Sequence, residues 1–489
     1  MVVDNIFYQY MLPVISVFLF LYSLLILIRQ VKKDKNIFRD TRTSYKILLV
    51  LLLIFGGAIR FMAQYFSYHP QYMYSAIAKT IFETGRYGFC TLEFNYCFPT
   101  YKPYTVYVSL LGFLYSFLEG ASFSLARNLN VVFGTLSIPL AYMVSKKYLN
   151  KSSNAIIFTS FFTFLPLHIE LSKSMETHVF SIFYMLAFFL FFKEFIDTGD
   201  WNIFGGTLLM FLMAALSKPL NTLLIFPLAI SFYKKNGFEK FEKAIKNRRV
   251  LFPLISGLVF LPIYYYFLFR QGVVFDTGVV FFQDNQLSRL FLSTNFYIVI
   301  GLLSLLGLTY FIFKKRYFFL GILALYVTPL IIHTQRKPVR LILPALIIML
   351  FMSSDLIIGL GEKFFEKNLH VFVILTVILM STVFFNSGFH RQPYNYFNEE
   401  DLLDSELQRI SENYVIYSDR ADLAYSVSTV KVHNLNFEEP DFLDETDVAV
   451  LNRGLCDDIN PMIEEDLQDF ENKDEIVIGD LYSICLFSR

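Results

Sequence analysis

The sequence contains few charged residues. Asp, Glu, Lys and Arg make up 17% of its 489 positions, whereas 55% are hydrophobic and 18% aromatic, a balance too apolar for a soluble protein of this length. The sequence also lacks a phosphate-binding P-loop, a G-x-S-x-G nucleophile sequence and a zinc-binding pattern, so none of these common sites is expected. Nothing in it indicates a nucleic-acid partner.

The two signs of charge are unevenly distributed, although the formal net charge is zero. Positions 391–489 hold 7 basic and 24 acidic residues, so the preceding part of the chain is basic by the same margin. We therefore divide the chain into a basic membrane domain, residues 1–390, and an acidic domain, residues 391–489. Short β-like runs alternate with helical stretches in the second part, which predicts a small C-terminal α/β domain.

Nearly uncharged runs of about 16–22 residues recur along the first part, and this is the length that crosses a bilayer as a helix. The predicted fold class is a mainly α polytopic membrane protein. The first run has no small-residue cleavage pattern, so we expect it to be retained. The twelve predicted spans are 7–28, 47–66, 124–145, 154–169, 177–195, 202–217, 219–233, 250–268, 295–313, 317–332, 341–360 and 369–386.

The positions of Lys and Arg indicate which loops are cytoplasmic, because positively charged loops prefer that side. If the short apolar run 104–118 is an interfacial helix outside, 23 of the 35 basic residues before position 391 lie in cytoplasmic loops. Counting it as a span would move 16 of these outside. The favoured arrangement places both termini, the long loop 67–123 and the acidic domain on the outer face of the plasma membrane.

The outer loop 67–123 begins with a helix signal. Pro70 suits the first turn of a helix and Gly85 suits its end. Apolar residues recur between them at helical spacing, beside a polar stripe of Gln71, Ser75 and Lys79. This pattern predicts an amphipathic helix lying on the membrane surface.

The order of several short sequences resembles the GT-C membrane glycosyltransferases, in particular the dolichyl-phosphate-mannose–protein mannosyltransferases and the lipid A aminoarabinose transferases. The resemblance implies a polyprenyl-phosphate-linked sugar as donor, a glycan, lipid or protein hydroxyl as acceptor, and a site among membrane lipids. The matching features are Arg60, His69–Pro70, Gly85–Arg86–Tyr87, Lys102–Pro103–Tyr104, Arg127, Ser172 to Glu176, Lys218–Pro219 and Arg340 to Pro344.

One position departs from that family. Its His-Pro pair is followed by acidic residues, implicated in activating the acceptor or holding a metal, but here the next residues are Gln71 and Tyr72. Neither an amide nor an ordinary phenol is a good base near neutral pH. Glu83 lies twelve residues along the same helix, about 18 Å away, and cannot replace them. We therefore expect Gln71, Tyr72 and Tyr87 to contact the sugar or the acceptor.

The donor phosphate needs cations on the outer face, where basic residues are few. Lys218 lies at a break between two short spans, and three other basic residues cluster in the loop 333–340. The alternative for all of them is contact with lipid headgroups, and for Arg60 a structural ion pair. The candidate donor-binding residues are Lys218, Arg340, Arg336, Lys337, Arg60 and His69.

The candidate catalytic residues are two outer carboxylates, Glu176 at the family position and Glu170 behind it. His168 and His178 flank them. A divalent metal held by His168, Glu176 and His178 is a weaker hypothesis, because positions i and i+2 face different ways on a helix. No cofactor is assigned.

All four cysteines fall on the outer side in this topology, where disulfides persist. The predicted pairs are Cys90–Cys97 and Cys456–Cys485, and free buried thiols are the alternative.

The function we predict is transfer of a sugar from a polyprenyl-phosphate donor at the outer face. One alternative is a catalytically degenerate GT-C relative that binds lipid or glycan, and another is a lipid or solute transporter. Few ionisable residues fall in mid-membrane, which argues against ion-coupled transport.

The topology predicts that Lys240 and Lys315 are cytoplasmic and that Lys102 and Glu439 are external. Single cysteines at these positions should react with a membrane-impermeant thiol reagent in whole cells only at 102 and 439. Labelling at 240 without labelling at 102 would reverse the orientation and place the site on the wrong side.

Overall fold

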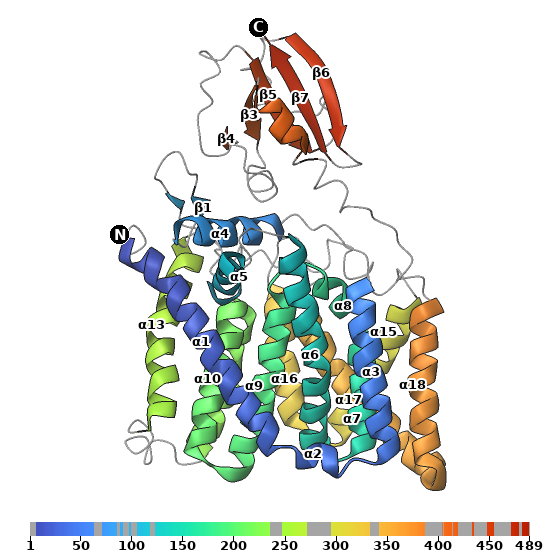
Figure 1. Ribbon diagram of the computed structural model, residues 1–489. Coiled ribbons are helices and arrows are strands. Elements are labelled where there is room, and N and C mark those ends of the chain that lie inside the picture. The colour runs from blue at the N-terminus through green and yellow to red at the C-terminus, as the bar shows by residue number, and fades with distance from the viewer. Residues whose placement is uncertain are drawn as a thin grey trace.

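The chain forms a bundle of helices, with a β-sheet near the C-terminus, in a computed structural model (Figure 1). The structure describes residues 6–62, 71–85, 89–90, 97–98, 105–117, 123–234, 247–270, 295–332, 342–386, 403, 405–412, 414–418, 433–434, 447–453, 471–478 and 482–488. The first helices are α1 (Ile6–Lys33), α2 (Asn36–Arg39), α3 (Thr43–Met62), α4 (Gln71–Thr84), α5 (Thr105–Phe117), α6 (Phe123–Leu149), α7 (Ser152–Thr163), α8 (Pro166–Ser172) and α9 (His178–Thr198). They are followed by α10 (Trp201–Ser217), η1 (Pro219–Leu224), α11 (Ile225–Lys234), α13 (Arg248–Arg270), α15 (Asn295–Phe313), α16 (Tyr317–Ile332), α17 (Leu343–Phe364), η3 (Glu366–Asn368) and α18 (Leu369–Asn386).

The helices make this a multi-pass membrane protein. In the described part of the chain, six helices are long and apolar enough to cross a membrane, namely α1, α3, α6, α9, α17 and α18. The bent pair α7 and α8 makes a seventh if it is one span. Most of the predicted spans coincide with one helix, but 154–169 is the bent pair α7 and α8, and 219–233 consists of η1 and the ten-residue α11. Helices α10 and α16 are also shorter than the spanning helices, so the count of twelve spans stays a prediction.

Helix α9 is the centre of the bundle. Every residue from His178 to Phe192 is buried, and a helix that is apolar on all sides must be covered on all sides. Helices α6 and α10 pack along it. Its aromatic side chains interdigitate with theirs, and the ring centroids of Phe180 and Phe133 lie 4.8 Å apart.

The predicted span 154–169 is wrong as a single helix. Helices α7 and α8 are bent by 58° at the break before Pro166. Pro166 occupies the first turn of α8, and the preceding Leu165 is extended, because proline disfavours helical backbone in the residue before it. The predicted break at Lys218 is present, since Lys218 is extended between α10 and η1.

Helix α4 begins at Gln71, close to the predicted start, but it is more deeply buried than an amphipathic surface helix. The polar stripe is covered, since Ser75 and Lys79 are buried. Ser75 hydrogen-bonds Tyr115 of α5 at 2.9 Å, and Lys79 has Glu83 4.0 Å away. A Cβ at Gly112 of α5 would come within 2.8 Å of the Ala78 carbonyl oxygen, so the two helices cross in close contact.

Five strands near the C-terminus form one mixed sheet in the order β4-β3-β5-β7-β6. Strand β3 pairs in parallel with β4 and β5, while β7 is antiparallel to β5 and β6. That this part of the chain is a separate domain stays a prediction. The strands are β1 (Phe89–Cys90), β2 (Cys97–Phe98), β3 (Val415–Ser418), β4 (His433–Asn434), β5 (Asp447–Arg453), β6 (Glu471–Ile478) and β7 (Tyr482–Ser488).

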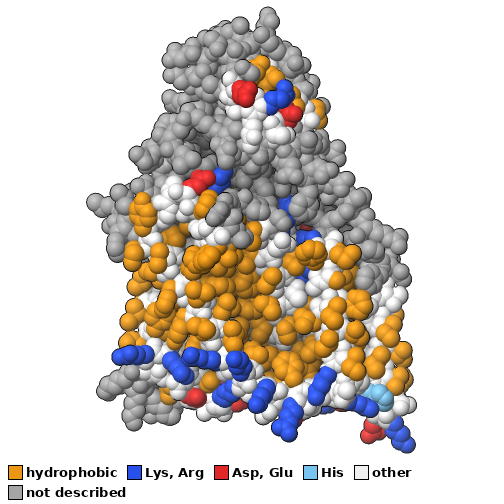
Figure 2. Space-filling view, in the orientation of Figure 1, with side chains coloured by type: hydrophobic (Ala, Val, Ile, Leu, Met, Phe, Trp, Pro, Cys, Tyr) orange, Lys and Arg blue, Asp and Glu red, His pale blue; other side chains and the backbone are white. Residues whose placement is uncertain are grey.

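Lys and Arg side chains form a band along one edge of the apolar surface, at the end of the bundle where α2 lies (Figure 2). We call this the basic end. Helices α4 and α8 lie at the opposite end (Figure 1). The stretch from Arg29 to Lys46, which we predict to be cytoplasmic, surrounds α2 at the basic end.

The cysteines give a test that does not depend on function. Strands β1 and β2 are antiparallel, with Cys90 directly opposite Cys97, and cross-strand Cα separations fall in the range that a disulfide needs. Cys485 is disulfide-bonded, while Cys456 lies outside the described residues. Denatured, non-reduced protein should therefore show no reactive thiol with a maleimide reagent. Four reactive thiols would overturn both predicted pairs.

Candidate functional site

Arg60 is a fully buried residue in a polar cluster, which lies at the end of the helix bundle opposite the basic end. It lies in the last described turn of α3, which the structure describes as far as Met62; the predicted end at residue 66 lies outside the described residues. Its side chain donates to the carbonyl oxygen of Gly56 at 2.8 Å and contacts Nδ1 of His168 in α8 at 2.8 Å. Because arginine only donates, Nδ1 accepts, and the ring proton of His168 lies on Nε2. Among the described residues, that nitrogen has no hydrogen-bond partner.

Two glycines leave room for the Arg60 side chain. A Cβ at Gly56 would lie 3.1 Å from a guanidinium nitrogen of Arg60, and a Cβ at Gly134 would lie 3.2 Å from its Cδ. The Gly134 Cβ would also lie 2.4 Å from the Ser172 hydroxyl oxygen. Any side chain at these positions would therefore displace Arg60 or α8.

The turn between α8 and α9 carries the predicted acid Glu176. The Asn130 amide of α6 donates to the carbonyl oxygens of Ser174, at 2.5 Å, and Glu176, at 2.7 Å. The Glu176 carboxylate lies 3.0 Å from Nε2 of His178, the first residue of α9. Both side chains are buried. The backbone of Glu176 therefore contacts α6 through Asn130, and its carboxylate contacts α9 through His178.

Three cations meet around this turn. The exposed fractions of Arg60 and Arg127 are 0% and 2%, and that of Glu176 is 1%. Lys173 donates to the carbonyl oxygen of Phe61, at the end of α3, and its ammonium lies 5.9 Å from the Phe61 ring centroid. Burial and the positive charge of Arg127 lower the pKa of Lys173 to about 8. A site this cationic and this dry favours an anionic ligand.

The second predicted acid, Glu170, belongs to the same cluster. It lies on α8, is only partly exposed, and interacts electrostatically with Glu176. The metal hypothesis fails for the described residues, which contain no group of three His, Cys, Asp or Glu placed to hold an ion. His168 also has its Nδ1 engaged by Arg60, which leaves it a single nitrogen for any ligand.

The break at Lys218 is fixed close to the first turn of α9. Asn221 in η1 donates to the Ser181 hydroxyl of α9 at 2.6 Å and to the Ala214 carbonyl oxygen of α10 at 3.0 Å. Tyr326 of α16 donates to the Asn221 side chain at 2.8 Å. Ser181 lies three residues beyond His178, so Lys218 stands at the same end of the bundle as Glu176.

The remaining candidates are not placed. His69, Tyr87, Arg336, Lys337 and Arg340 lie outside the described residues. Gln71 and Tyr72 occupy the first turn of α4, but their side chains are likewise outside the described part.

Solved structures show a similar arrangement of helices. The chain shares its fold with ArnT from Cupriavidus metallidurans. The match covers 91% of this chain and 98% of that one, with a TM-score of 0.57 for ArnT bound to undecaprenyl phosphate and 0.56 for ArnT in the apo state. Sequence identity is 10% in both. No family model matches the sequence, and no curated protein matches it either.

The predicted resemblance to the aminoarabinose transferase branch of the GT-C proteins is therefore confirmed at the level of the fold. Sequence reasoning listed Arg127 and Lys173 only among the features that resemble the family, without a role, and it did not name Asn130. Arg127 and Asn130 are three residues apart and share one face of α6, which is a signal that the sequence did contain. The hydrogen bonds from Asn130 to the turn 174–176 could be recognised only in the tertiary structure.

The two hydrogen bonds from Asn130 to the turn 174–176 predict that replacing Asn130 lowers the stability of the protein. Asn130→Asp removes both amide donors and places a carboxylate against two buried carbonyl oxygens. We expect the free energy of unfolding to fall by about 2 kcal/mol or more, since each buried polar group left unsatisfied costs about 1–3 kcal/mol. Unfolding by denaturing detergent measures it. Asn128→Asp, exposed on the same helix, is the matched control. If the free energy of unfolding fell equally in both variants, the hydrogen bonds from Asn130 would not be stabilising the turn.

Proposed function

We propose that this protein is a GT-C-type glycosyltransferase that moves a sugar from a polyprenyl-phosphate donor to a hydroxyl at the outer face of the plasma membrane. The observation that carries the proposal is the meeting of buried Arg60, Arg127 and Glu176 with Lys173 and Glu170 at one end of an ArnT-like bundle. The end opposite the basic end is the external one by the positive-inside rule.

The donor phosphate binds at Lys173 and Arg127 in this proposal. Both cations lie where α6 meets the turn before α9, and each acts electrostatically on the other. Two like charges held together in a dry site are stabilised by an anion between them. The fold neighbour ArnT has been seen with undecaprenyl phosphate, a ligand of the same chemical class.

Lys218 completes the phosphate site from the other side of α9, together with Arg340 and with Arg336 and Lys337 from the loop before α17. Arg60 acts through His168, because its guanidinium is already engaged by Gly56 and His168. His168 can then donate from Nε2 toward a ligand oxygen. His69, Gln71, Tyr72 and Tyr87 remain proposed contacts of the donor or the acceptor.

The reaction is a displacement at the anomeric carbon of the sugar. The acceptor oxygen forms a bond to that carbon, and the bond from the carbon to the phosphate oxygen breaks. The polyprenyl phosphate leaves with the electron pair, and the acceptor proton passes to the Glu176 carboxylate. Contact with His178 keeps that carboxylate in one orientation, as a general base requires.

The residues Gln71 and Tyr72 favour a second candidate, a degenerate relative that binds lipid or glycan without turnover. An enzyme of this family with that change needs its base elsewhere. Glu176, with Glu170 behind it, is the acid that the described residues offer at this end of the bundle next to the cations.

Glu176→Gln separates the two candidates. Transfer from a synthetic polyprenyl-phosphate sugar should fall by about 10²–10⁴-fold, the usual contribution of a positioned base, while binding of the donor changes little. Glu366→Gln, at an exposed position in η3, is the matched control and should retain most turnover. A variant that turns over like the parent places the base at another residue. A parent that binds the donor without any turnover, and gains some with Gln71→Asp and Tyr72→Glu, identifies the degenerate relative.

The lowered pKa of Lys173 predicts a pH dependence of phosphate binding. Lys173 carries its charge below pH 8 and loses it as the pH rises through about 8, whereas a phosphate monoester is already fully ionised there. Affinity for polyprenyl phosphate should therefore fall between pH 8 and pH 10. Lys173→Arg should flatten the profile, because arginine stays charged. An unchanged profile in that variant would remove Lys173 from the phosphate site.

A further inference from the structure

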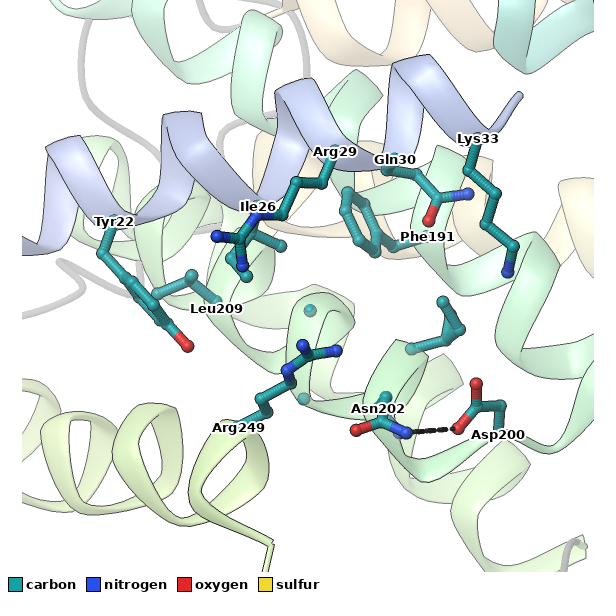
Figure 3. A pocket seen from close by; sticks show the side chains of 13 residues that line it. Tyr22, Ile26, Arg29, Gln30, Lys33, Phe191, Asp200, Asn202, Leu209 and Arg249 are labelled. Atoms are coloured by element: carbon teal, nitrogen blue, oxygen red, sulfur yellow. Dashed lines mark hydrogen bonds between the residues drawn. The ribbon is translucent and has the colours of Figure 1, made fainter. Parts of the chain in front are cut away.

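A second polar pocket lies at the basic end, away from the candidate active site. It has a volume of about 210 Å³ and lies between α1, α9, α10 and α13 (Figure 3). Its polar lining comprises Tyr22, Arg29, Gln30, Lys33, Arg249, Asp200 and Asn202. Since one water takes up about 30 Å³ in the liquid, the pocket has room for a phosphate-sized group.

Two arginines from different helices point into this space. Figure 3 shows the guanidinium groups of Arg29, from α1, and Arg249, from α13, directed toward the same region of the pocket. Neither side chain forms an ion pair or a hydrogen bond in the described part of the chain. Two unpaired guanidinium groups repel each other, and each has five N–H donors suited to phosphate oxygens.

The nearby acids are already engaged elsewhere. Asp200 caps α10 by accepting from the backbone N–H of Asn202 at 2.8 Å and from its side chain at 3.2 Å. Glu194 accepts from Lys33 at 2.6 Å and from Gln30 at 2.6 Å. The lining therefore keeps an excess of positive charge, which Asp200 does not neutralise.

Both arginines are held in place by their helices. Lys147 of α6 pairs with Asp34, just beyond α1, at 2.8 Å and also with Glu194, so the end of α1 is tied to α6 and α9. On the other side, α13 packs directly on α10. A Cβ at Gly205 would lie 2.3 Å from the Arg249 carbonyl oxygen, so only glycine allows this approach.

The surroundings favour a lipid over a soluble ligand. The pocket lies between the last turns of α1 and the first turn of α13, at the basic end, where headgroups lie. The ring of Phe252 in α13 packs edge-on against Tyr22 and Phe18 of α1, with centroids 5.2 and 5.7 Å away. These contacts close the gap between the two helices on the membrane side of the pocket. Leu25 and Ile28, next to the pocket on α1, are exposed apolar residues available to acyl chains.

We propose that Arg29 and Arg249 form a binding site for the phosphate of an anionic phospholipid headgroup on the cytoplasmic side. The phosphate oxygens accept from both guanidinium groups, with Tyr22 and Asn202 as neighbouring polar contacts. This site is separate from the donor site, and it joins α1 to α13 through the bound lipid.

The test uses the full chain in neutral detergent micelles, titrated with dioleoyl phosphatidylglycerol or with dioleoyl phosphatidylcholine, and bound lipid is counted by native mass spectrometry. The parent should prefer phosphatidylglycerol by at least about tenfold. Arg29→Ala with Arg249→Ala should lose about tenfold in affinity for phosphatidylglycerol, and Arg29→Lys with Arg249→Lys should lose less. Removing a charge that binds phosphate typically has effects of this size.

The control removes two positive charges from neighbouring positions on the same helices that do not line the pocket, with Lys32→Ala and Arg248→Ala. It should keep the affinity of the parent within about twofold. If both double variants lost the same affinity for phosphatidylglycerol, the proposed site would be wrong. If the double variant does not fold, Arg249→Ala against Arg248→Ala makes the same comparison. Glycerol phosphate tests whether the ligand is a lipid or a soluble phosphate. If glycerol phosphate binds as tightly as phosphatidylglycerol, and this binding needs Arg29 and Arg249, the ligand is not a lipid.

Discussion

The site depends on the burial of positive charge at the end of the bundle opposite the basic end. Arg60 and Arg127 are almost completely buried, and Lys173 lies between them and solvent. A charge taken out of water is costly unless it is paired or hydrogen-bonded, so the surrounding helices must supply acceptors. Gly56 and Phe61 supply carbonyl oxygens, and His168 supplies a ring nitrogen.

The local features of the fold follow from that constraint. Pro166 bends the chain so that α8 brings His168 over the end of α3, and Gly134 lets α8 approach α6 closely. Asn130 then fixes the turn that carries Glu176. The opposite end contains ion pairs such as Arg316 with Asp355 at 2.9 Å and Lys151 with Glu362 at 2.6 Å. The buried cationic cluster and the exposed band of Lys and Arg side chains therefore lie at opposite ends of the bundle.

Much of this could be read from the sequence, because apolar run length and loop charge are one-dimensional signals. The helices, the break at Lys218, the strands near the C-terminus and the GT-C resemblance were all predictable. The kink before Pro166 and the burial of α4 were not, since they depend on which helices lie alongside. Within the site, Arg60 and Glu176 could be named from their positions. The contact of Arg60 with His168 and the hydrogen bonds from Asn130 to the turn of Glu176 could not be predicted, because they join residues far apart in the chain.

The most direct measurement of the central claim is release of polyprenyl phosphate by the purified protein. A panel of synthetic polyprenyl-phosphate sugars would be incubated with it, together with glycans and lipids extracted from the source membranes. The account predicts that at least one sugar is transferred and that an equal amount of polyprenyl phosphate appears. If every donor binds but none is consumed, while the protein remains folded, the cationic cluster is a lipid-binding site and the assignment as a transferase is wrong.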